Sequence, residues 1–411
     1  MKILIVNTSD IDGGAARATY RIHKSLLSAG IDSKMLVIDK KSDDYTVIGP
    51  RSKKEKLIIK IRMLLDSFLI RFYKNRTKTL FSTSYLPFSN IVDKINEINP
   101  DIVHLHWICR SMINITDLSK IEAPIIWGLL DMWAFTGGCH YDEYCGEYKN
   151  NCGKCKVLGS LKKNDLSRFI YNKKKLVFSQ LPNMKIVGHS KWLANSAKES
   201  SLFENNEVFN IPSAIDTNIF KPFSKKECLK LWGLPANKKL VLFGAMAATS
   251  DPRKGFKELS EALNKLQDKN IEFVVFGSSK PQNAPDLDFK THYLGHLHDD
   301  ISLVTLYSAV DVMIVPSLQE NLSNAIMESL SCGTPVVAFD IGGNSDMIEH
   351  QNTGYLAKPF DTTDLKDGIE WVLNSSNYEE LCVNAREKVL KEFDSVVVAK
   401  RYMELYEEMI K

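Results

Sequence analysis

Two glutamates, Glu320 and Glu328, stand eight residues apart in a stretch whose residue types favour binding of a phosphorylated ligand. Glu320 follows a predicted strand, 311–315, that ends at Pro316, and Glu328 lies in the predicted helix 323–331. The residues between the glutamates would offer backbone N–H groups at the helix N-terminus, where the helix dipole favours phosphate or diphosphate. These residues are Asn321, Leu322, Ser323 and Asn324. Ser323 or Asn324 would equally serve as an ordinary helix N-cap.

A basic pair, Arg253-Lys254, stands where a predicted strand, 239–244, gives way to a predicted helix, 257–266. Lysine supplies positive charge to a diphosphate, and arginine can bind two of its oxygens at once. A solvated basic turn is the simpler interpretation of these two residues taken alone.

A glycine pair, Gly13-Gly14, lies between the buried strand 2–7 and the first predicted helix. Glycines at a strand-to-helix turn let a ligand approach the backbone closely. The pattern is not G-x-G-x-x-G, and no acidic residue stands at a convincing distance to hold a ribose, so a dinucleotide fingerprint is poorly supported. A tight turn without a ligand is the alternative.

Polar side chains follow two further strands predicted in the N-terminal half. Strand 101–107 carries His104 and His106 on one face, and strand 124–130 ends at Asp131. In an open α/β sheet, ligands bind at the carboxyl ends of the strands. His106, Asp131 and the nearby His140 are therefore candidate catalytic residues. For His104 we favour a histidine that is buried in the core and has no catalytic role. For His106 a core role and a catalytic role both stay open.

Four of the eight cysteines fall within 17 residues, with the spacing C-x5-C-x6-C-x2-C. They are Cys139, Cys145, Cys152 and Cys155. Four thiolates could close a tetrahedral zinc site, which would be structural because no ligand position stays open. In a reducing compartment such a cluster suggests metal before disulfide. Unligated thiols and an adventitious disulfide are the alternatives.

The segment 51–78 combines ten Lys and Arg residues with apolar residues at helical spacing, which predicts a basic amphipathic helix. Such helices can lie on anionic membrane surfaces. An ordinary surface helix with a solvated basic face is the alternative. Nucleic acid is a less favoured partner, because no aromatic-interleaved basic platform or binding motif accompanies the helix.

The length of the chain and the order of its predicted elements favour two domains. A chain of 411 residues exceeds one compact core, and 44% apolar with 25% charged residues is typical of a soluble globular protein. Two βα series follow one another, which predicts an α/β fold with two Rossmann-like domains facing across a cleft. We place the N-terminal domain at 1–217 and the C-terminal domain at 218–394.

The first residues and the apolar runs of the chain indicate where in the cell the protein is expected. The first residues, M-K-I-L-I-V, are too short for a signal-peptide core, and no apolar run approaches the ~20 residues of a membrane span. We therefore expect a cytoplasmic protein. The formal net charge of +3 is too small to identify a partner.

The chain resembles the GT-B fold retaining glycosyltransferases of family 4, most closely the bacterial branch that builds capsule, exopolysaccharide and lipopolysaccharide O-antigen. The resemblance covers nearly the whole chain. Its most specific element is the pair Glu320 and Glu328 within P-S-x-x-E-N-x-x-N-A-x-x-E, followed by C-G-T-P-V-V-A and G-G. R-K-G-F and D-M-W-A-F-T-G-G-C-H-Y support it. It implies that helix 395–411 packs back on the N-terminal domain.

The resemblance also implies roles for individual residues. Glu320 would lie near the transferred sugar, the amides of 321–324 would hold the distal phosphate, and Glu328 would bind the ribose. Lys254, with Arg253 beside it, would bind the diphosphate of a UDP- or GDP-linked sugar. The Gly13-Gly14 loop would approach the donor phosphate and the acceptor. The family needs no metal for chemistry, because cationic and amide groups stabilise the leaving diphosphate, so any zinc would be structural.

The chain departs from the family pattern at Leu130, where relatives commonly carry a histidine near the donor sugar. Either His106 or His140 takes over, or donor choice or rate is altered, or the protein is inactive. The family's arginine is also displaced, with Ala248 and Thr249 about where it is expected. We expect a retaining, metal-independent hexosyltransferase acting on a glycan or lipid-linked acceptor. A nucleotide-sugar epimerase of the same fold and an inactive nucleotide-sugar-binding homologue are the alternatives.

Overall fold

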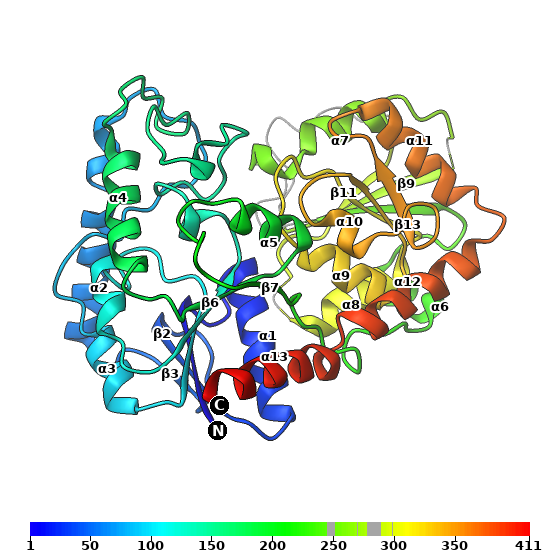
Figure 1. Cartoon of the computed structure of the whole chain (residues 1–411). Coiled ribbons are helices and arrows are strands. Elements are labelled where there is room, and N and C mark those ends of the chain that lie inside the picture. The colour runs from blue at the N-terminus through cyan, green and yellow to red at the C-terminus, as the bar shows by residue number, and fades with distance from the viewer. Residues whose placement is uncertain (245–250, 269, 278–288, 298) are drawn as a thin grey trace. The chain divides into compact units, whose positions relative to one another are not determined.

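The computed structural model describes residues 1–244, 251–268, 270–277, 289–297 and 299–411, and these form two compact units. The N-terminal unit comprises Met1–Ser213 together with Val398–Lys411, and the C-terminal unit comprises Ala214–Val397 (Figure 1). The first boundary lies four residues before the expected one at 217, and the second lies three residues after the expected return at 395.

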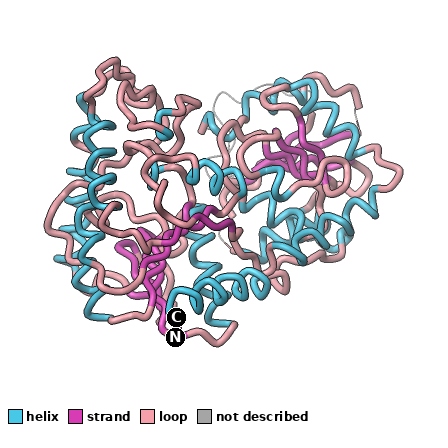
Figure 2. The backbone as a smooth tube through the Cα atoms, in the orientation of Figure 1, coloured by secondary structure: helices cyan, strands magenta, loops and turns pink. Residues whose placement is uncertain are grey.

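The N-terminal unit is built on a seven-stranded parallel sheet with the order β3-β2-β1-β4-β5-β6-β7 (Figure 2). The strands are β1 (Lys2–Ser9), β2 (Asp32–Asp39), β3 (Val47–Ile48), β4 (Ile102–Leu105), β5 (Ile125–Leu129), β6 (Lys185–Gly188) and β7 (Val208–Asn210). The order 3-2-1-4-5-6 is that of a Rossmann fold, in which ligands bind where the strand order reverses. That point lies between β1 and β4.

The helices of this unit are α1 (Gly14–Ser28), α2 (Lys53–Asp66), α3 (Ile91–Ile98), α4 (Leu166–Phe178), α5 (Lys191–Lys198) and most of α13 (Ser395–Ile410). The helix predicted over 51–78 is shorter than expected. It ends at Asp66, and only a short 3₁₀ segment, η1 (Leu69–Phe72), follows. Thr83 binds both the backbone carbonyl and the carboxylate of Asp66, at 2.9 and 2.6 Å.

The C-terminal unit repeats the same strand order in a six-stranded parallel sheet, β10-β9-β8-β11-β12-β13. Its strands are β8 (Lys239–Gly244), β9 (Ile271–Phe276), β10 (Thr291–Tyr293), β11 (Val312–Val315), β12 (Val336–Phe339) and β13 (Gly354–Ala357). Its helices are α6 (Lys225–Trp232), α7 (Phe256–Leu263), α8 (Asp300–Ala309), α9 (Asn324–Ser331), α10 (Asn344–Met347), α11 (Thr362–Leu373) and α12 (Tyr378–Glu392). Across the described parts of both units, no helix is both long and apolar enough to cross a membrane.

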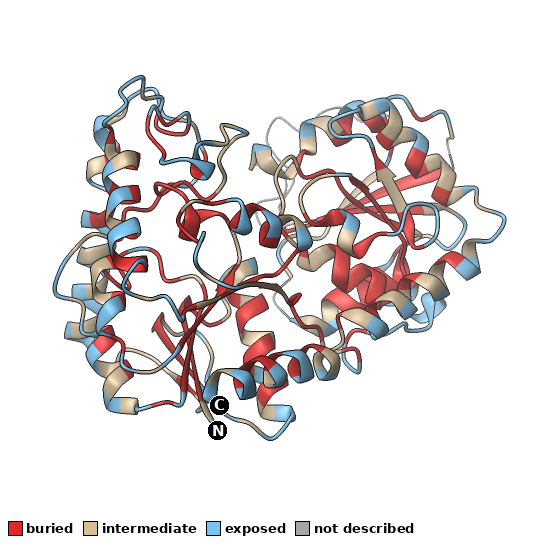
Figure 3. Cartoon of the chain, in the orientation of Figure 1, coloured by how far each residue is buried: buried red, intermediate tan, exposed pale blue. Residues whose placement is uncertain are grey.

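Both sheets form the centres of their units, because their strands are near-continuous apolar runs with helices on both faces. The strand β11 is fully buried, as are the central residues of β1 and β8 (Figure 3). The helix α13 completes the N-terminal unit. The Tyr406 hydroxyl lies 2.8 Å from His104 Nδ1, and the Arg401 guanidinium donates to the Asn210 carbonyl at 2.6 Å. The expected return of this helix is therefore confirmed.

Three buried histidines, His104, His106 and His189, form a row beneath α13. The His106 ring lies 4.2 Å from that of His104 and 5.5 Å from that of His189, measured between ring centroids. Gly128 of β5 makes room for the row, since a Cβ there would lie 2.6 Å from His106 Cε1. His104 is a core histidine as expected, although its partner is the Tyr406 hydroxyl and not the backbone.

Burial keeps these imidazoles neutral in the folded chain. It lowers the pKa of His104 to about 3 and of His189 to about 4, and it lowers the pKa of His106 well below its usual value. Their ordinary pKa is about 6.5, so below that pH the unfolded chain binds more protons than the folded chain.

We therefore predict that the free energy of unfolding of the N-terminal unit falls as the pH drops from about 6.5 towards about 4, by up to about 1.4 kcal/mol per pH unit for each histidine. Urea denaturation followed by tryptophan fluorescence measures this slope. His189→Gln should make the slope shallower, whereas His350→Gln, at an exposed position, should not. A stability that stays constant over this pH range would contradict the prediction.

Candidate functional site

The candidate residues of the C-terminal unit lie where its strand order reverses, between β8 and β11. After β8, the 3₁₀ segment η5 (Pro252–Lys254) leads into α7. After β11, the loop 316–323 leads into α9. The expected sites of the displaced arginine, Ala248 and Thr249, lie outside the described residues.

Lys254 and Glu320, predicted from separate motifs, are in direct contact. The Lys254 ammonium lies 3.0 Å from Glu320 Oε2, and both side chains are partly exposed, at 26% and 14%. Ser317 Oγ lies 3.5 Å from the same carboxylate oxygen. The contact places a cation and a hydrogen-bond acceptor side by side at the point where a Rossmann-like sheet binds ligands.

Two glycines, Gly255 and Gly342, bring three loops close enough for this contact. A Cβ on Gly255 would lie 1.8 Å from the Pro316 carbonyl oxygen, and a Cβ on Gly342 would lie 1.8 Å from the Glu320 carbonyl oxygen. Both glycines have positive φ, +70° and +54°. The Leu318 N–H also donates to the Arg253 carbonyl, at 2.8 Å. Both glycines belong to motifs of the family resemblance, R-K-G-F and G-G, but the sequence did not indicate which backbone they approach.

The side chain of Arg253 folds back on the turn that contains it and binds Asp251. Its guanidinium donates to both carboxylate oxygens of Asp251, at 3.2 and 2.7 Å. Burial raises the pKa of Asp251, but the hydrogen bonds and charge of Arg253 outweigh it and lower the pKa overall. Diphosphate binding by Arg253 stays a prediction.

The helix α9 begins as predicted, at Asn324, with Ser323 at the N-cap position. The Ser323 side chain makes no capping hydrogen bond, so it does not act as the simple cap considered above. Asn321 and Ser323 are buried, and Leu322 packs against the apolar core of the unit. The helix thus starts within the same loop as Glu320, and its dipole adds to the positive charge of Lys254.

Glu328, in the second turn of α9, is only 5% exposed and is held by Tyr307 of α8. The Tyr307 hydroxyl donates to Glu328 Oε2 at 3.0 Å. Sequence reasoning missed Tyr307, because a single tyrosine in an apolar helix carries no signal of a contact 21 residues away.

In the N-terminal unit, the structure brings Asp131 and His140 together. His140 Nδ1 lies 2.6 Å from Asp131 Oδ2, and the Trp107 indole N–H donates to the same oxygen at 2.8 Å. On its other side, His140 Nε2 lies 2.9 Å from Ser82 Oγ. Burial raises the pKa of Asp131, but His140 and these hydrogen bonds lower it overall. The carboxylate therefore stays ionised and fixes the orientation of the imidazole.

The order Asp131, His140, Ser82 matches the connectivity of a hydrolytic triad. Ser82 is only 4% exposed, however, so the network orients His140 and does not present a nucleophile. His106 belongs to the buried row with His104 and His189. Leu130 directly follows β5, and replacement of its missing imidazole by His140 stays a prediction.

The loop after β1 contains Gly13, which precedes α1 with φ +95°, and Gly14, the first residue of the helix. Asp10 ties this loop to the one after β2, because its carboxylate accepts N–H bonds from Lys41 and Ser42 at 2.9 Å each. A positive φ explains a glycine at position 13. Ligand binding there stays a prediction.

The four clustered cysteines are free thiols. Among the described residues, no group of three or more His, Cys, Asp or Glu side chains is arranged to hold a metal ion. A hydrogen bond with Cys155 and burial raise the pKa of Cys139, and the same hydrogen bond lowers the pKa of Cys155. Cys139 and Cys155 pack with Phe81 and Ile170 in a small apolar cluster. The arrangement of these side chains gives the zinc prediction no support.

Comparison with known proteins identifies the C-terminal unit. Residues 237–375 match the family model described as "Glycosyl transferases group 1". The chain is 29% identical over 258 residues to N,N'-diacetylbacillosaminyl-diphospho-undecaprenol alpha-1,3-N-acetylgalactosaminyltransferase of Campylobacter jejuni, covering 61% of this chain and 66% of that protein. It is 24% identical over 212 residues to UDP-Gal:alpha-D-GlcNAc-diphosphoundecaprenol alpha-1,3-galactosyltransferase of Escherichia coli, covering 49% and 54%. The matched segments thus span about half to two thirds of these relatives.

Solved structures match over the whole chain. Sucrose-phosphate synthase from Thermosynechococcus elongatus aligns with a TM-score of 0.70 at 17% identity, covering 100% of this chain and 99% of that one. Anabaena HepE in complex with UDP aligns with a TM-score of 0.63 at 15% identity, covering 99% and 100%. At these identities the likeness establishes the fold, which is the expected GT-B fold.

Gly342→Ala should destabilise the C-terminal unit by at least about 1 kcal/mol more than Gly333→Ala does. Both glycines have positive φ, but a Cβ on Gly333 would find its nearest neighbour at 3.4 Å and not at 1.8 Å. Gly333→Ala therefore isolates the conformational cost, and the difference reports the clash with Glu320. Urea denaturation of the two variants measures the difference, and equal losses would contradict the packing described for this loop.

Proposed function

We propose that this chain, a GT-B protein with a glycosyltransferase group 1 domain, transfers a sugar from a nucleotide-diphosphate sugar to a lipid-linked glycan. The contact between Lys254 and Glu320 is the observation that carries the proposal. The leaving group of such a reaction is a nucleoside diphosphate, and the sugar beside it presents hydroxyl groups. One cation and one carboxylate, 3.0 Å apart, match these two parts of one donor.

The reaction proposed is a metal-independent transfer that retains the anomeric configuration. Lys254 and the N-terminus of α9 stabilise the negative charge that develops on the leaving diphosphate, which removes the need for a metal ion. Glu320 accepts hydrogen bonds from the sugar hydroxyls, and Glu328, oriented by Tyr307, binds the ribose of a UDP- or GDP-linked donor. In the N-terminal unit, the two ring nitrogens of the buried His140 lie at hydrogen-bond distance from Asp131 and Ser82, so this histidine positions the loop after β5 and is given no contact with the sugar.

The names of the relatives support a lipid-linked acceptor. Both enzymes named above act, by their names, on a sugar carried by diphospho-undecaprenol. Both are transferases, and nothing in the comparisons favours the epimerase alternative.

We predict that Lys254→Ala lowers kcat by about 100-fold, because it removes one preorganised charge from the leaving group. Glu320→Gln should lower kcat/KM by a similar factor. A thermal-shift screen of nucleotide sugars first identifies the donor, since a ligand of the folded state raises its apparent stability.

The matched control is Lys257→Ala, three residues from Lys254, whose side chain is 83% exposed and pairs only loosely with Glu261, at 3.8 Å. It should leave turnover unchanged. Equal activity of the Lys254 and Lys257 variants would refute the assigned role. A wild type that binds a donor and shows no turnover would favour the inactive-homologue alternative.

We further propose that α2 docks the protein on an anionic membrane surface at the inner face of the cell membrane. Apolar side chains on α2 and η1 are about half exposed or more: Leu57, Ile61, Leu64, Phe68 and Phe72. The same helix carries Lys53, Lys54, Lys56, Lys60 and Arg62. A stripe of exposed apolar residues with flanking cations is the pattern of an interfacial helix.

Sedimentation with vesicles tests this docking. The protein should bind vesicles that contain phosphatidylglycerol, and the binding should weaken as salt screens the charges. Leu64→Glu should reduce binding several-fold, because it places a carboxylate in the apolar stripe. Leu231→Glu, at an equally exposed apolar position on α6 (64% and 69%), should not. Salt-insensitive binding, or the same loss in both variants, would argue against α2 as the docking element.

A further inference from the structure

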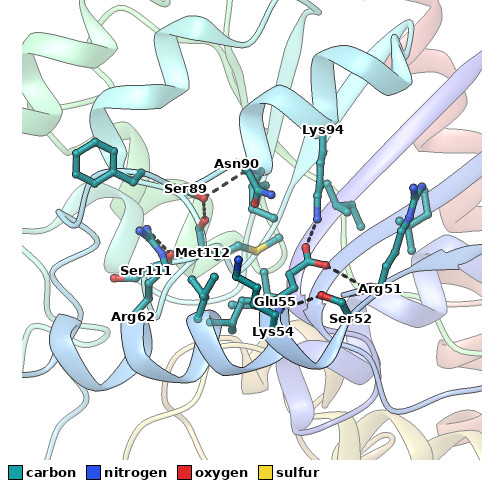
Figure 4. A pocket seen from close by; sticks show the side chains of 18 of the residues that line it. Arg51, Ser52, Lys54, Glu55, Arg62, Ser89, Asn90, Lys94, Ser111 and Met112 are labelled. Carbon is teal, nitrogen blue, oxygen red and sulfur yellow. Dashed lines mark hydrogen bonds and ion pairs between the residues drawn. The ribbon is translucent and has the colours of Figure 1, made fainter.

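The helix α2 covers a cavity and packs on the apolar core of its unit through Ile59. Of its 14 residues, only Asp66 is buried. Beneath it lies a cavity of about 480 Å³, bounded by α2, α3, β2 and the segment 110–112 (Figure 4). This volume falls within the range of about 300–1,000 Å³ that is usual for small-molecule sites.

The floor of the cavity is apolar. Leu36 and Ile38 of β2, Ile91 of α3 and Met112 line it from below, and each is buried. Ile58 and Ile59 line it from α2. A hydrocarbon chain in this space would remove apolar surface from water on both sides.

The charged residues that line the cavity are mostly cationic. Five are basic and two, Glu55 and Glu97, are acidic. Lys94 pairs with Glu55, and Arg62 donates to the carbonyls of Leu86 and Ser111, at 3.2 and 3.1 Å. The three remaining cations are Arg51, Lys54 and Arg110. An anionic head group beside an apolar chain would complement this lining.

The bonds of Glu55 and Arg62 hold α2 over the cavity at two points. Glu55 anchors the first turn of the helix to α3 through Lys94, and Arg62 anchors a later turn to the loops 86–87 and 111. Figure 4 shows both anchors, with the cavity-lining side chains between them. These bonds therefore hold α2 over the cavity in addition to the packing of Ile59.

We propose that this cavity binds the lipid anchor of the acceptor, namely the isoprenoid chain next to its diphosphate. The chain lies on the apolar floor under α2, and the diphosphate contacts Arg51 and Lys54 at the first turn of the helix. This assignment rests on the proposed lipid-linked acceptor. It adds a binding site to the membrane-facing role of α2, because the apolar residues that line the cavity, Ile58 and Ile59, are not those of the exposed apolar stripe.

Calorimetric titration with farnesyl diphosphate, a soluble isoprenoid diphosphate, tests the site without a membrane and without turnover. Farnesyl diphosphate should bind at least ten times more tightly than inorganic diphosphate, which lacks the chain. It should also bind at least ten times more tightly than dioctanoyl phosphatidylglycerol, which presents a different chain and head group. Equal affinity for inorganic diphosphate would overturn the role of the apolar floor, and equal affinity for the phospholipid would overturn the choice of occupant.

Two variants locate the bound probe. Ile58→Trp should fill the cavity and lower the affinity for farnesyl diphosphate at least ten-fold. The variant should fold, because Ile58 is 46% exposed. Lys54→Glu should lower the affinity for farnesyl diphosphate at least five times more than Lys56→Glu does. Lys56→Glu makes the same charge change on α2, but outside the cavity lining. An unchanged affinity of the Ile58 variant, or equal losses in the two lysine variants, would overturn the site.

The same titrations separate this inference from the proposed function. Lys254→Ala, in the C-terminal unit, should leave farnesyl diphosphate binding unchanged while it lowers turnover. If the protein turns over its donor but does not bind farnesyl diphosphate, the cavity assignment is overturned and the transferase proposal stands. Binding of the probe by a protein without any transferase activity would overturn the proposed function instead.

Discussion

The close approach of backbone atoms around Glu320 is the constraint on which the C-terminal site depends. Gly255 and Gly342 let the loops after three neighbouring strands touch where a side chain would not fit. The ion pair between Lys254 and Glu320 is partly exposed, and such pairs contribute only about 0–1 kcal/mol. The glycines therefore permit the approach of the loops, and the backbone hydrogen bond from Leu318 to Arg253 joins two of them. The ammonium and the carboxylate can exchange partners at little cost when a ligand arrives.

The N-terminal unit uses buried histidines in two different ways. His104, His106 and His189 share one apolar layer, and burial holds their imidazoles neutral. His140 is equally buried but has the carboxylate of Asp131 at 2.6 Å, which orients the ring. The other ring nitrogen of His140 lies 2.9 Å from Ser82 Oγ, so this ring joins two loops of the unit, whereas His104 and His189 contact the tyrosines of α13.

The sequence predicted what depends on local pattern and missed what depends on contacts between distant segments. The strand, loop and helix around Glu320 fall within about a residue of expectation, because apolar periodicity and turn residues define them. The contact between Lys254 and Glu320 follows from the strand order, because β8 and β11 are neighbours and the two residues lie in the loops after them. The end of α2 at Asp66, set by Thr83, and the hold of Tyr307 on Glu328 lie in no local pattern. The cysteine spacing predicted zinc, and zinc binding stays a prediction.

The sparse burial of α2 makes tolerance to mutation unequal across the chain. A helix that buries a single residue contributes little to the free energy of folding, so most substitutions along residues 53–66 should be nearly neutral for stability. The glycine contacts at Gly255 and Gly342 accept no side chain without displacing backbone. The fold therefore constrains the exposed residues of this helix less than it constrains the loops around Glu320. For engineering, the exposed positions of residues 53–65 can be exchanged to change what the helix binds while the fold is kept.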